Sequence, residues 1–166
     1  MLVLVTGGAG FIGSHLCKRL VKGGHQVAAV DNLSDGSVEN LKELEGNPQF
    51  TFYEFDVNNI IKLRSVFSTY PFDMVFHMAA NADVNKGEES PQVDYENTLQ
   101  TTLSVLEMMR VFEIKKFFFA SSSTVYGNAE DRLQDHRSIM RPISHYGAAK
   151  LASEAFVSSF SSLHNF

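Results

Sequence analysis

The sequence has no tryptophan, a single cysteine, four prolines and no long apolar run. One cysteine excludes an internal disulfide and a cysteine-rich metal site, and it fits a reducing cytoplasm. No stretch approaches the roughly eighteen apolar residues of a membrane span, and the first apolar run is too short for a signal peptide. Basic residues are also few, since 14 Lys and Arg against 19 Asp and Glu give a net charge of −5. We therefore expect a cytoplasmic protein without a metal site and without a membrane or nucleic acid as partner.

Strand and helix patterns alternate along the whole chain. With 166 residues and 44% hydrophobic content, the chain fits one globular domain. Short apolar runs predict strands over residues 2–5, 26–30, 50–55, 73–78 and 116–120, and helical patterns follow each of them. Strands separated by helices form a parallel sheet covered on both faces. The sequence therefore predicts an α/β, doubly wound Rossmann fold with strand order 3-2-1-4-5.

Glycines recur at a regular spacing directly after the first apolar run. That run ends at Thr6, and Gly7, Gly10 and Gly13 precede a helical pattern. The first glycine permits a tight turn, the second lets a pyrophosphate approach the backbone, and the third lets helix and strand pack closely. The free N–H groups of the helix N-terminus attract phosphate. This strand, turn and helix predict a dinucleotide site.

An acidic residue closes the second predicted strand. Asp31 lies eighteen residues after Gly13, where a carboxylate can accept both ribose hydroxyls of an adenosine. It would repel a 2′-phosphate, and residues 32–37 contain no Arg or Lys to hold one. The sequence therefore favours NAD over NADP. The alternative is that Asp31 only caps a turn.

Tyr146 and Lys150 lie four residues apart in the last predicted helix, over 144–164. This spacing places both side chains on one helix face. A free tyrosine has a pKa of ~10, and a nearby ammonium and a cationic nicotinamide would both favour the phenolate. The pair alone is a weak signal, but its place after the fifth strand of a dinucleotide fold makes it a candidate catalytic base.

The chain resembles the extended short-chain dehydrogenase/reductase family, in particular its NAD-dependent sugar-nucleotide epimerases and dehydratases. The matching segments follow the family's order along the whole chain. They are Thr6–His15, Asp31-Asn32, Asp56-Val57, His77–Ala80, Asn97, Ser121–Gly127 and the Tyr146/Lys150 pair. The resemblance implies an enzyme with NAD as cofactor and a nucleotide-sugar, most simply a UDP-sugar, as substrate. It also implies a homodimer in the intact protein.

The resemblance assigns roles residue by residue. The residues implied to bind the cofactor are Gly7, Gly10, Phe11, Ile12, Gly13, Asp31, Asn32, Asp56, Val57, Met78, Ala79, Ala80, Asn97, Tyr146 and Lys150. Those implied to be catalytic are Ser122, Tyr146 and Lys150. Those implied to contact substrate are Ser122, Ser123, Thr124 and Tyr146.

Two departures limit the finer assignment. Family dehydratases carry Asp-Glu where this chain has Ser123 and Thr124, so elimination of water lacks its carboxylates. Many 4-epimerases carry a cofactor-contacting lysine near the place of Asn81 or Ala82. We expect residues 1–166 to form the NAD-binding domain of a truncated 4-epimerase-like enzyme whose substrate domain is absent. The alternatives are a related reductase, decarboxylase or dehydratase, or a non-catalytic NAD-binding module.

Overall fold

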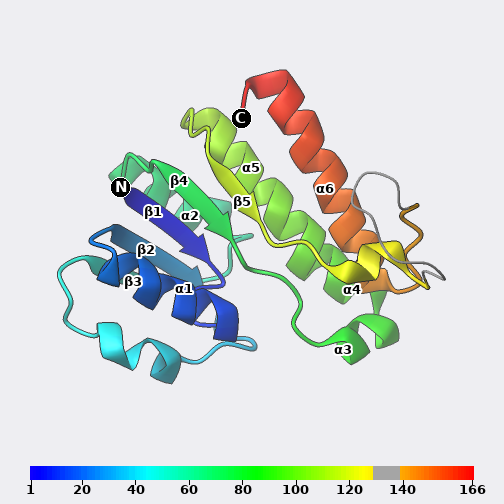
Figure 1. Cartoon of the computed structure of the whole chain (residues 1–166), viewed down its shortest axis with the longest axis horizontal. Helices are drawn as coiled ribbons and strands as arrows, with labels where there is room; N and C mark the ends of the chain where they lie inside the picture. Colours follow the sequence, from blue (N-terminus) through cyan, green and yellow to red (C-terminus); the bar gives the residue numbers. More distant parts are fainter. Residues whose placement is uncertain (129–138) are drawn as a thin grey trace.

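The computed structural model of the chain describes residues 1–128 and 139–166 (Figure 1). The strands are β1 (Leu2–Thr6), β2 (Gln26–Asp31), β3 (Phe50–Glu54), β4 (Met74–His77) and β5 (Phe117–Phe119). The α-helices are α1 (Phe11–Lys22), α2 (Ile60–Thr69), α3 (Val84–Glu89), α4 (Pro91–Asp94), α5 (Thr101–Val111) and α6 (His145–His164). Two 3-10 helices, η1 (Val38–Leu44) and η3 (Ser123–Tyr126), and one π-helical turn, η2 (Tyr95–Gln100), complete the described elements.

The strands form one parallel sheet in the order β3-β2-β1-β4-β5. This confirms the predicted Rossmann fold and its strand order. In the register, Thr6 at the end of β1 lies opposite Val30 of β2 and His77 of β4. The three central strands therefore end together. β2 lies on one side of β1 and β4 on the other, so the strand order reverses at β1. Ligands bind at this edge in such sheets.

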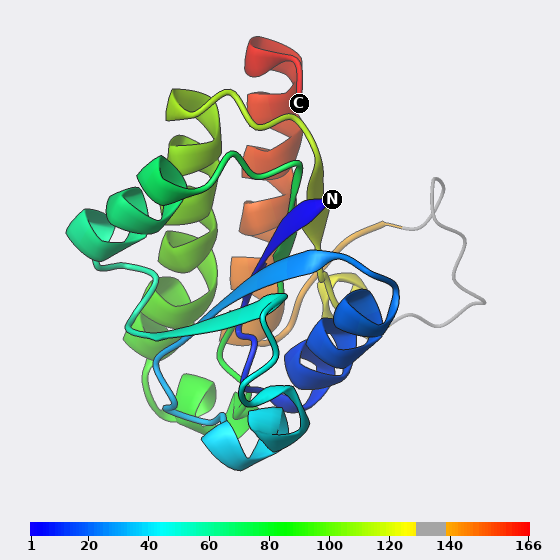
Figure 2. The same cartoon turned by 90° about the vertical axis from the view of Figure 1, so that its left-hand side faces the viewer.

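Two apolar cores cover the two faces of the sheet. On one face, Leu4, Val30 and Val75 of the strands pack with buried residues of α2 and α5, among them Phe67 and Met109. On the other face, the strands pack with buried residues of α1 and η1. Figure 2 shows this layering, with α1 and η1 in blue and cyan on one side and α2 and α5 in green on the other. Every strand of the centre is thus buried on both faces, as an all-parallel sheet requires.

α1 begins directly at the glycine turn. Its N-cap residue is Gly10, which offers no side-chain cap, and the helix ends before Gly23. Cys17 and Val21 are buried against the sheet, and burial raises the pKa of the Cys17 thiol to about 12. Cys17 is therefore an inert packing residue.

The helical run over 91–111 is less regular than the sequence predicted. The apolar spacing of this run indicates one long helix, but the π-helical turn η2 separates α4 from α5. The short helix α3 was not anticipated, and residues 38–44 form a 3-10 helix rather than an α-helix. At the start of α2, Ile60 is 43% exposed, whereas Leu63, Val66 and Phe67 of the same helix are buried.

His77 fastens the end of β4 to its neighbours. It is fully buried; its Nδ1 lies 2.7 Å from Thr6 Oγ1 and its Nε2 lies 3.1 Å from Thr102 Oγ1. Because Thr102 donates its own proton to the carbonyl of Thr98, Nε2 must donate and Nδ1 must accept. Burial lowers the pKa of His77 to about 3, so the ring is neutral. His77 is therefore a structural hydrogen-bonding residue.

Candidate functional site

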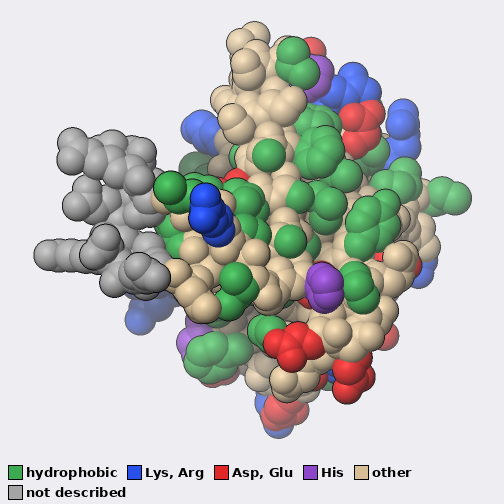
Figure 3. All heavy atoms as spheres, turned by 90° about the vertical axis from the view of Figure 1, so that its right-hand side faces the viewer, with side chains coloured by type: hydrophobic (Ala, Val, Ile, Leu, Met, Phe, Trp, Pro, Cys, Tyr) green, Lys and Arg blue, Asp and Glu red, His purple; other side chains and the backbone are tan. Residues whose placement is uncertain are grey.

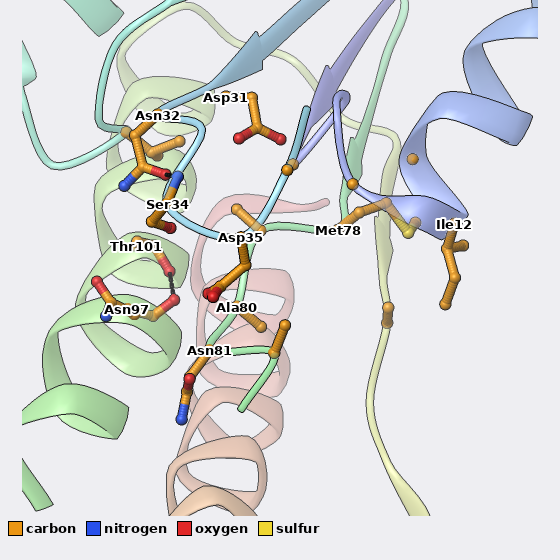
Figure 4. Close-up of a pocket in the computed structure, with 18 of the residues that line it drawn as sticks. Ile12, Asp31, Asn32, Ser34, Asp35, Met78, Ala80, Asn81, Asn97 and Thr101 are labelled. Carbon is orange, nitrogen blue, oxygen red and sulfur yellow. Dashed lines mark hydrogen bonds between the residues drawn. The ribbon is translucent and has the colours of Figure 1, made fainter. Parts of the chain in front are cut away.

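A pocket of about 400 Å³ lies at the carboxyl edge of the sheet, at the switch point between β1 and β4. Figure 4 shows its walls: the loop after β2, the segment after β4, the start of α1, and the helical run through η2 and α5. All fifteen residues that the sequence and the resemblance assigned to the cofactor line it. The pocket is lined in addition by Ser34, Asp35, Gly36, Asn81, Ala82, Thr101, Ala120 and Ser121.

The glycines make the floor of this pocket from bare backbone. Gly7 has a φ of +67°, and a Cβ there would lie 2.7 Å from the backbone nitrogen of Ala79. A Cβ on Gly13 would lie 2.0 Å from the carbonyl oxygen of Gly7, so any side chain would force the turn away from α1. Because Gly10 supplies no side-chain cap, the first-turn N–H groups of α1 remain available to a ligand. The predicted roles of Gly7 and Gly13 therefore have a steric basis in the structure.

Asp31 lines the pocket with its carboxylate held by backbone N–H groups. Its Oδ2 accepts from Ala9 at 2.9 Å, and its Oδ1 accepts from Leu33 at 2.8 Å. Asp31 thus caps the turn after β2, which was the alternative interpretation of this residue. Each carboxylate oxygen has a further lone pair, so this role leaves acceptors for a ribose diol. Binding of ribose by Asp31 stays a prediction.

Polar side chains link the loops at this end of the pocket. Asn32 donates to Asp56 at 3.0 Å, which ties the end of β2 to the segment after β3. Lys86 of α3 donates to Asp35 at 2.9 Å, across 51 residues of sequence. Residues 32–37 contain no cation, as the sequence analysis noted, but Lys86 brings one close from a helix that was not anticipated. Asp35 holds that cation in an ion pair.

α6 brings Tyr146 and Lys150 to the other end of the pocket. Ser144 caps this helix by accepting from the N–H of Gly147 at 3.0 Å. Lys150 is 2% exposed; its Nζ donates to the carbonyl of Ala120 at 2.7 Å and lies 5.7 Å from the centre of the Tyr146 ring. The two side chains therefore share one helix face, as their spacing predicted.

The proton affinities of this pair differ from the expectation. Burial lowers the pKa of Lys150 to about 8. Burial, followed by the negative charge of Asp94, raises the pKa of Tyr146 above its usual value of 10. A tyrosine that acts as a base at neutral pH requires a lowered pKa. The described chain alone raises the pKa of Tyr146 instead.

The serine-rich segment after β5 lies beside the pocket, and only part of it reaches the wall. Ser121 lines the pocket and donates to Glu154, one turn beyond Lys150 on α6. Ser122 instead caps η3: its Oγ accepts from the N–H of Thr124 at 3.2 Å and from the Thr124 hydroxyl at 2.9 Å. Ser122, Ser123 and Thr124 are not among the lining residues, so their predicted contacts with substrate stay predictions.

Sequence reasoning missed Ser34, Asp35, Asn81 and Ser121 as pocket residues. All four follow the carboxyl ends of strands, and that position was the available signal. Within residues 1–128 and 139–166, no group of three His, Cys, Asp or Glu residues is placed to hold a metal ion. In the same part of the chain, no helix combines the length and apolar character needed to cross a membrane.

Comparison with protein families identifies the family of this chain. Residues 4–166 match the family model described as GDP-mannose 4,6 dehydratase. The chain belongs to this family. The resemblance to the extended short-chain dehydrogenase/reductases, with their sugar-nucleotide epimerases and dehydratases, is therefore confirmed, and the match extends over nearly the whole chain.

Relatives of known name support the same family. The chain is 37% identical over 156 residues to a UDP-glucuronate 4-epimerase of Thermodesulfobacterium geofontis, which covers 91% of this chain and 48% of that protein. It is 38% identical over 157 residues to a UDP-glucose 4-epimerase of Bacillus subtilis, which covers 93% and 46%. The chain thus spans about half the length of these curated relatives.

Solved structures of the family superpose on the whole chain. A UDP-glucose 4-epimerase of Thermotoga maritima, solved with UDP-glucose, has a TM-score of 0.92 at 37% identity and covers 100% of this chain and 53% of its own. A UDP-glucose 4-epimerase of Thermus thermophilus, solved as a complex with NAD, has a TM-score of 0.90 at 34% identity, covering 100% and 52%. Family membership therefore rests on sequence and on structure.

Proposed function

We propose that this chain is the NAD-binding half of a nucleotide-sugar 4-epimerase. One observation carries the proposal: the glycine turn, Asp31, Tyr146 and Lys150 line a single pocket at the switch point between β1 and β4, where the strand order reverses. Residues for a pyrophosphate, a ribose and a proton transfer are thereby arranged along one cavity. The names of the relatives, which are 4-epimerases of UDP-sugars, support the same activity.

The pocket has the chemistry that NAD requires. Its bare glycine floor and uncapped helix N-terminus suit a pyrophosphate, and a Cβ on Gly7 or Gly13 would close that floor. Asp31 and Asn32 would hold the adenosine ribose, while Asp56 and Val57 would meet the adenine. Bound there, NAD would supply a hydride acceptor and donor for the inversion of a hydroxyl-bearing carbon.

The residues of α6 and the serine segment would handle the proton. Tyr146 would take the proton of the C4 hydroxyl, and Lys150 would hold the nicotinamide ribose and favour the phenolate. Ser122 accepts two hydrogen bonds from Thr124 and keeps its own hydroxyl proton to donate, so a small rotation of the segment would let it orient the sugar hydroxyl.

A UDP-sugar is the substrate that we propose. The dehydratase alternative is disfavoured by Ser123 and Thr124, which stand where dehydratases carry an acid pair. We also propose that the whole enzyme adds a substrate domain to residues 1–166 and forms a homodimer. Its buried single cysteine fits the reducing cytoplasm, which cell fractionation would check.

The decisive assay is interconversion of UDP-glucose and UDP-galactose by the protein that carries these residues together with its substrate domain. Replacing Tyr146 by Phe should lower kcat by ~10²–10⁴-fold, the usual worth of a general base. Tyr95→Phe, at an exposed tyrosine that does not line the pocket, is the matched control and should keep wild-type kcat. Unchanged turnover in Tyr146→Phe, or turnover by residues 1–166 alone, would refute the proposal.

A further inference from the structure

The charged residues that line the pocket are divided between its two ends. Asp31, Asp35 and Asp56 follow β2 and β3, at the end where the proposed cofactor would place its adenosine. Of the described residues that line the pocket, only Lys150 is a cation, and it lies on α6, where its Nζ donates to the carbonyl of Ala120. The adenosine end is therefore lined by carboxylates, which oppose the binding of an additional phosphate there.

A cation approaches this end of the pocket from α3, outside the lining residues. Lys86 donates from its Nζ to Asp35 Oδ1 at 2.9 Å. The two residues are 51 positions apart, so the ion pair joins the loop after β2 to the segment after β4, on the two sides of the switch point. Figure 4 shows Asp35 on that loop, pointing toward Ala80 and Asn81 of the other segment. A group that could attract phosphate is thus present but already paired.

Close packing of α3 on α4 sets the place of Lys86. A Cβ on Gly87, the next residue, would lie 2.0 Å from Asp94 Oδ2, so α3 approaches α4 as closely as bare backbone permits. Asp94 is 1% exposed, and its Oδ1 accepts from the side-chain amide of Asn81 in the pocket wall at 2.8 Å. An exposed ion pair alone is a weak tie, but here a buried contact next to Lys86 holds its helix in place.

The ion pair lies near Asp31, the carboxylate proposed to bind the ribose. A Cβ on Gly36, the residue after Asp35, would lie 3.0 Å from Asp31 Oδ1. Because consecutive Cα atoms are about 3.8 Å apart, the backbone of Asp35 is one residue away from this contact. A lysine side chain is flexible, and its ammonium binds phosphate as a point charge. Without its partner Asp35, the half-exposed Lys86 would be free to bind a 2′-phosphate on that ribose.

We propose that Asp35 is a specificity-determining residue, because it occupies Lys86 in an ion pair and so denies the pocket a cation for a 2′-phosphate. The inference rests on the proposed function, which puts NAD in this pocket. Asp31 opposes a 2′-phosphate by its own charge, whereas Asp35 acts by holding the cation that would attract one. The preference for NAD therefore depends on a contact between the loop after β2 and α3, in addition to Asp31.

The test is calorimetric titration of the chain and its variants with NAD and with NADP. Asp35→Asn keeps the size of the side chain and removes its charge, which frees Lys86. NADP affinity should rise by about tenfold, the usual worth of one charge-assisted hydrogen bond, while NAD affinity changes little. In the double variant Asp35→Asn/Lys86→Gln this gain should disappear, because glutamine carries no charge. Lys86→Gln alone should not raise NADP affinity.

Glu39→Gln is the matched control, because it breaks the exposed Lys42–Glu39 ion pair on η1 and removes one negative charge that does not line this pocket. It should leave the affinities for both dinucleotides in place. An unchanged NADP affinity in Asp35→Asn, or a gain that persists in the double variant, would overturn the proposal while leaving the proposed function intact. A wild-type chain that binds neither dinucleotide would refute the proposed function, and this inference with it.

Discussion

At the scale of single residues, buried polar groups decide how this fold responds to pH. His77 is neutral and hydrogen-bonded through both ring nitrogens, and burial lowers its pKa from 6.5 to about 3. The unfolded chain therefore binds one more proton than the folded chain between these values. The contribution of neutral His77 to the free energy of unfolding is complete above pH 6.5 and is lost as the pH falls toward 3.

We predict that the free energy of unfolding falls by up to about 1.4 kcal/mol per pH unit in this window because of His77 alone. His77→Gln should lower stability at pH 7 but give a shallower slope, measured by urea unfolding at several pH values. His15→Gln, at an exposed histidine of α1, should keep the wild-type slope. Equal slopes in wild type and His77→Gln would contradict this account of His77.

Residue roles could be predicted where the backbone itself sets them. Gly7, Gly13 and Asp31 follow from the strand-turn-helix pattern, and the structure places them together at the pocket. Ser122 does not line the pocket, because its hydroxyl is used locally to cap η3, a competition that sequence spacing does not reveal. The close contact between Gly87 and Asp94 could not be predicted, because it joins α3, which the sequence did not indicate, to α4.

At the scale of secondary-structure elements, the strands were predicted to within two residues of their ends. Their apolar runs are short and bounded by polar or glycine turns, so pattern and burial agree. The helices after β2 and β4 were harder. Residues 38–44 adopt a 3-10 helix, α3 is only six residues long, and η2 interrupts a run whose apolar spacing indicates one continuous helix. Of these irregular elements, η2 lines the pocket through Asn97.

The cap of α6 gives an element-scale prediction, because this helix positions Tyr146 and Lys150. Ser144→Ala removes the acceptor for the N–H of Gly147 and should cost about 1 kcal/mol of unfolding free energy. Ser159→Ala, at an exposed position inside the same helix, should be neutral or slightly stabilising, since alanine has the higher helix propensity. Thermal and urea unfolding measure both. A loss at Ser159 equal to that at Ser144 would contradict the cap.

At the scale of the whole molecule, apolar side chains gather on the face shown in Figure 3. By resemblance to family dimers, we predict that the helical run from Pro91, which comprises α4, η2 and α5, forms a dimer interface with α6 in the intact protein. Leu99, Leu103 and Phe156 are the candidate contacts. Phe156 is 41% exposed, which leaves it available to a partner. Phe156→Glu should shift the mass measured by light scattering from dimer to monomer. Ile61→Glu, at an apolar residue of α2 that is 84% exposed, should not change the mass.

The central claim is that the pocket at the β1/β4 switch point holds NAD, and calorimetric titration of residues 1–166 with NAD and NADP tests it most directly. We predict that NAD binds more tightly than NADP, because Asp31 can accept from the ribose hydroxyls and repel a 2′-phosphate, while Lys86 is paired with Asp35. Asp31→Ala should reduce this preference. No heat with NAD, or NADP binding as tight as NAD or tighter, would contradict the account.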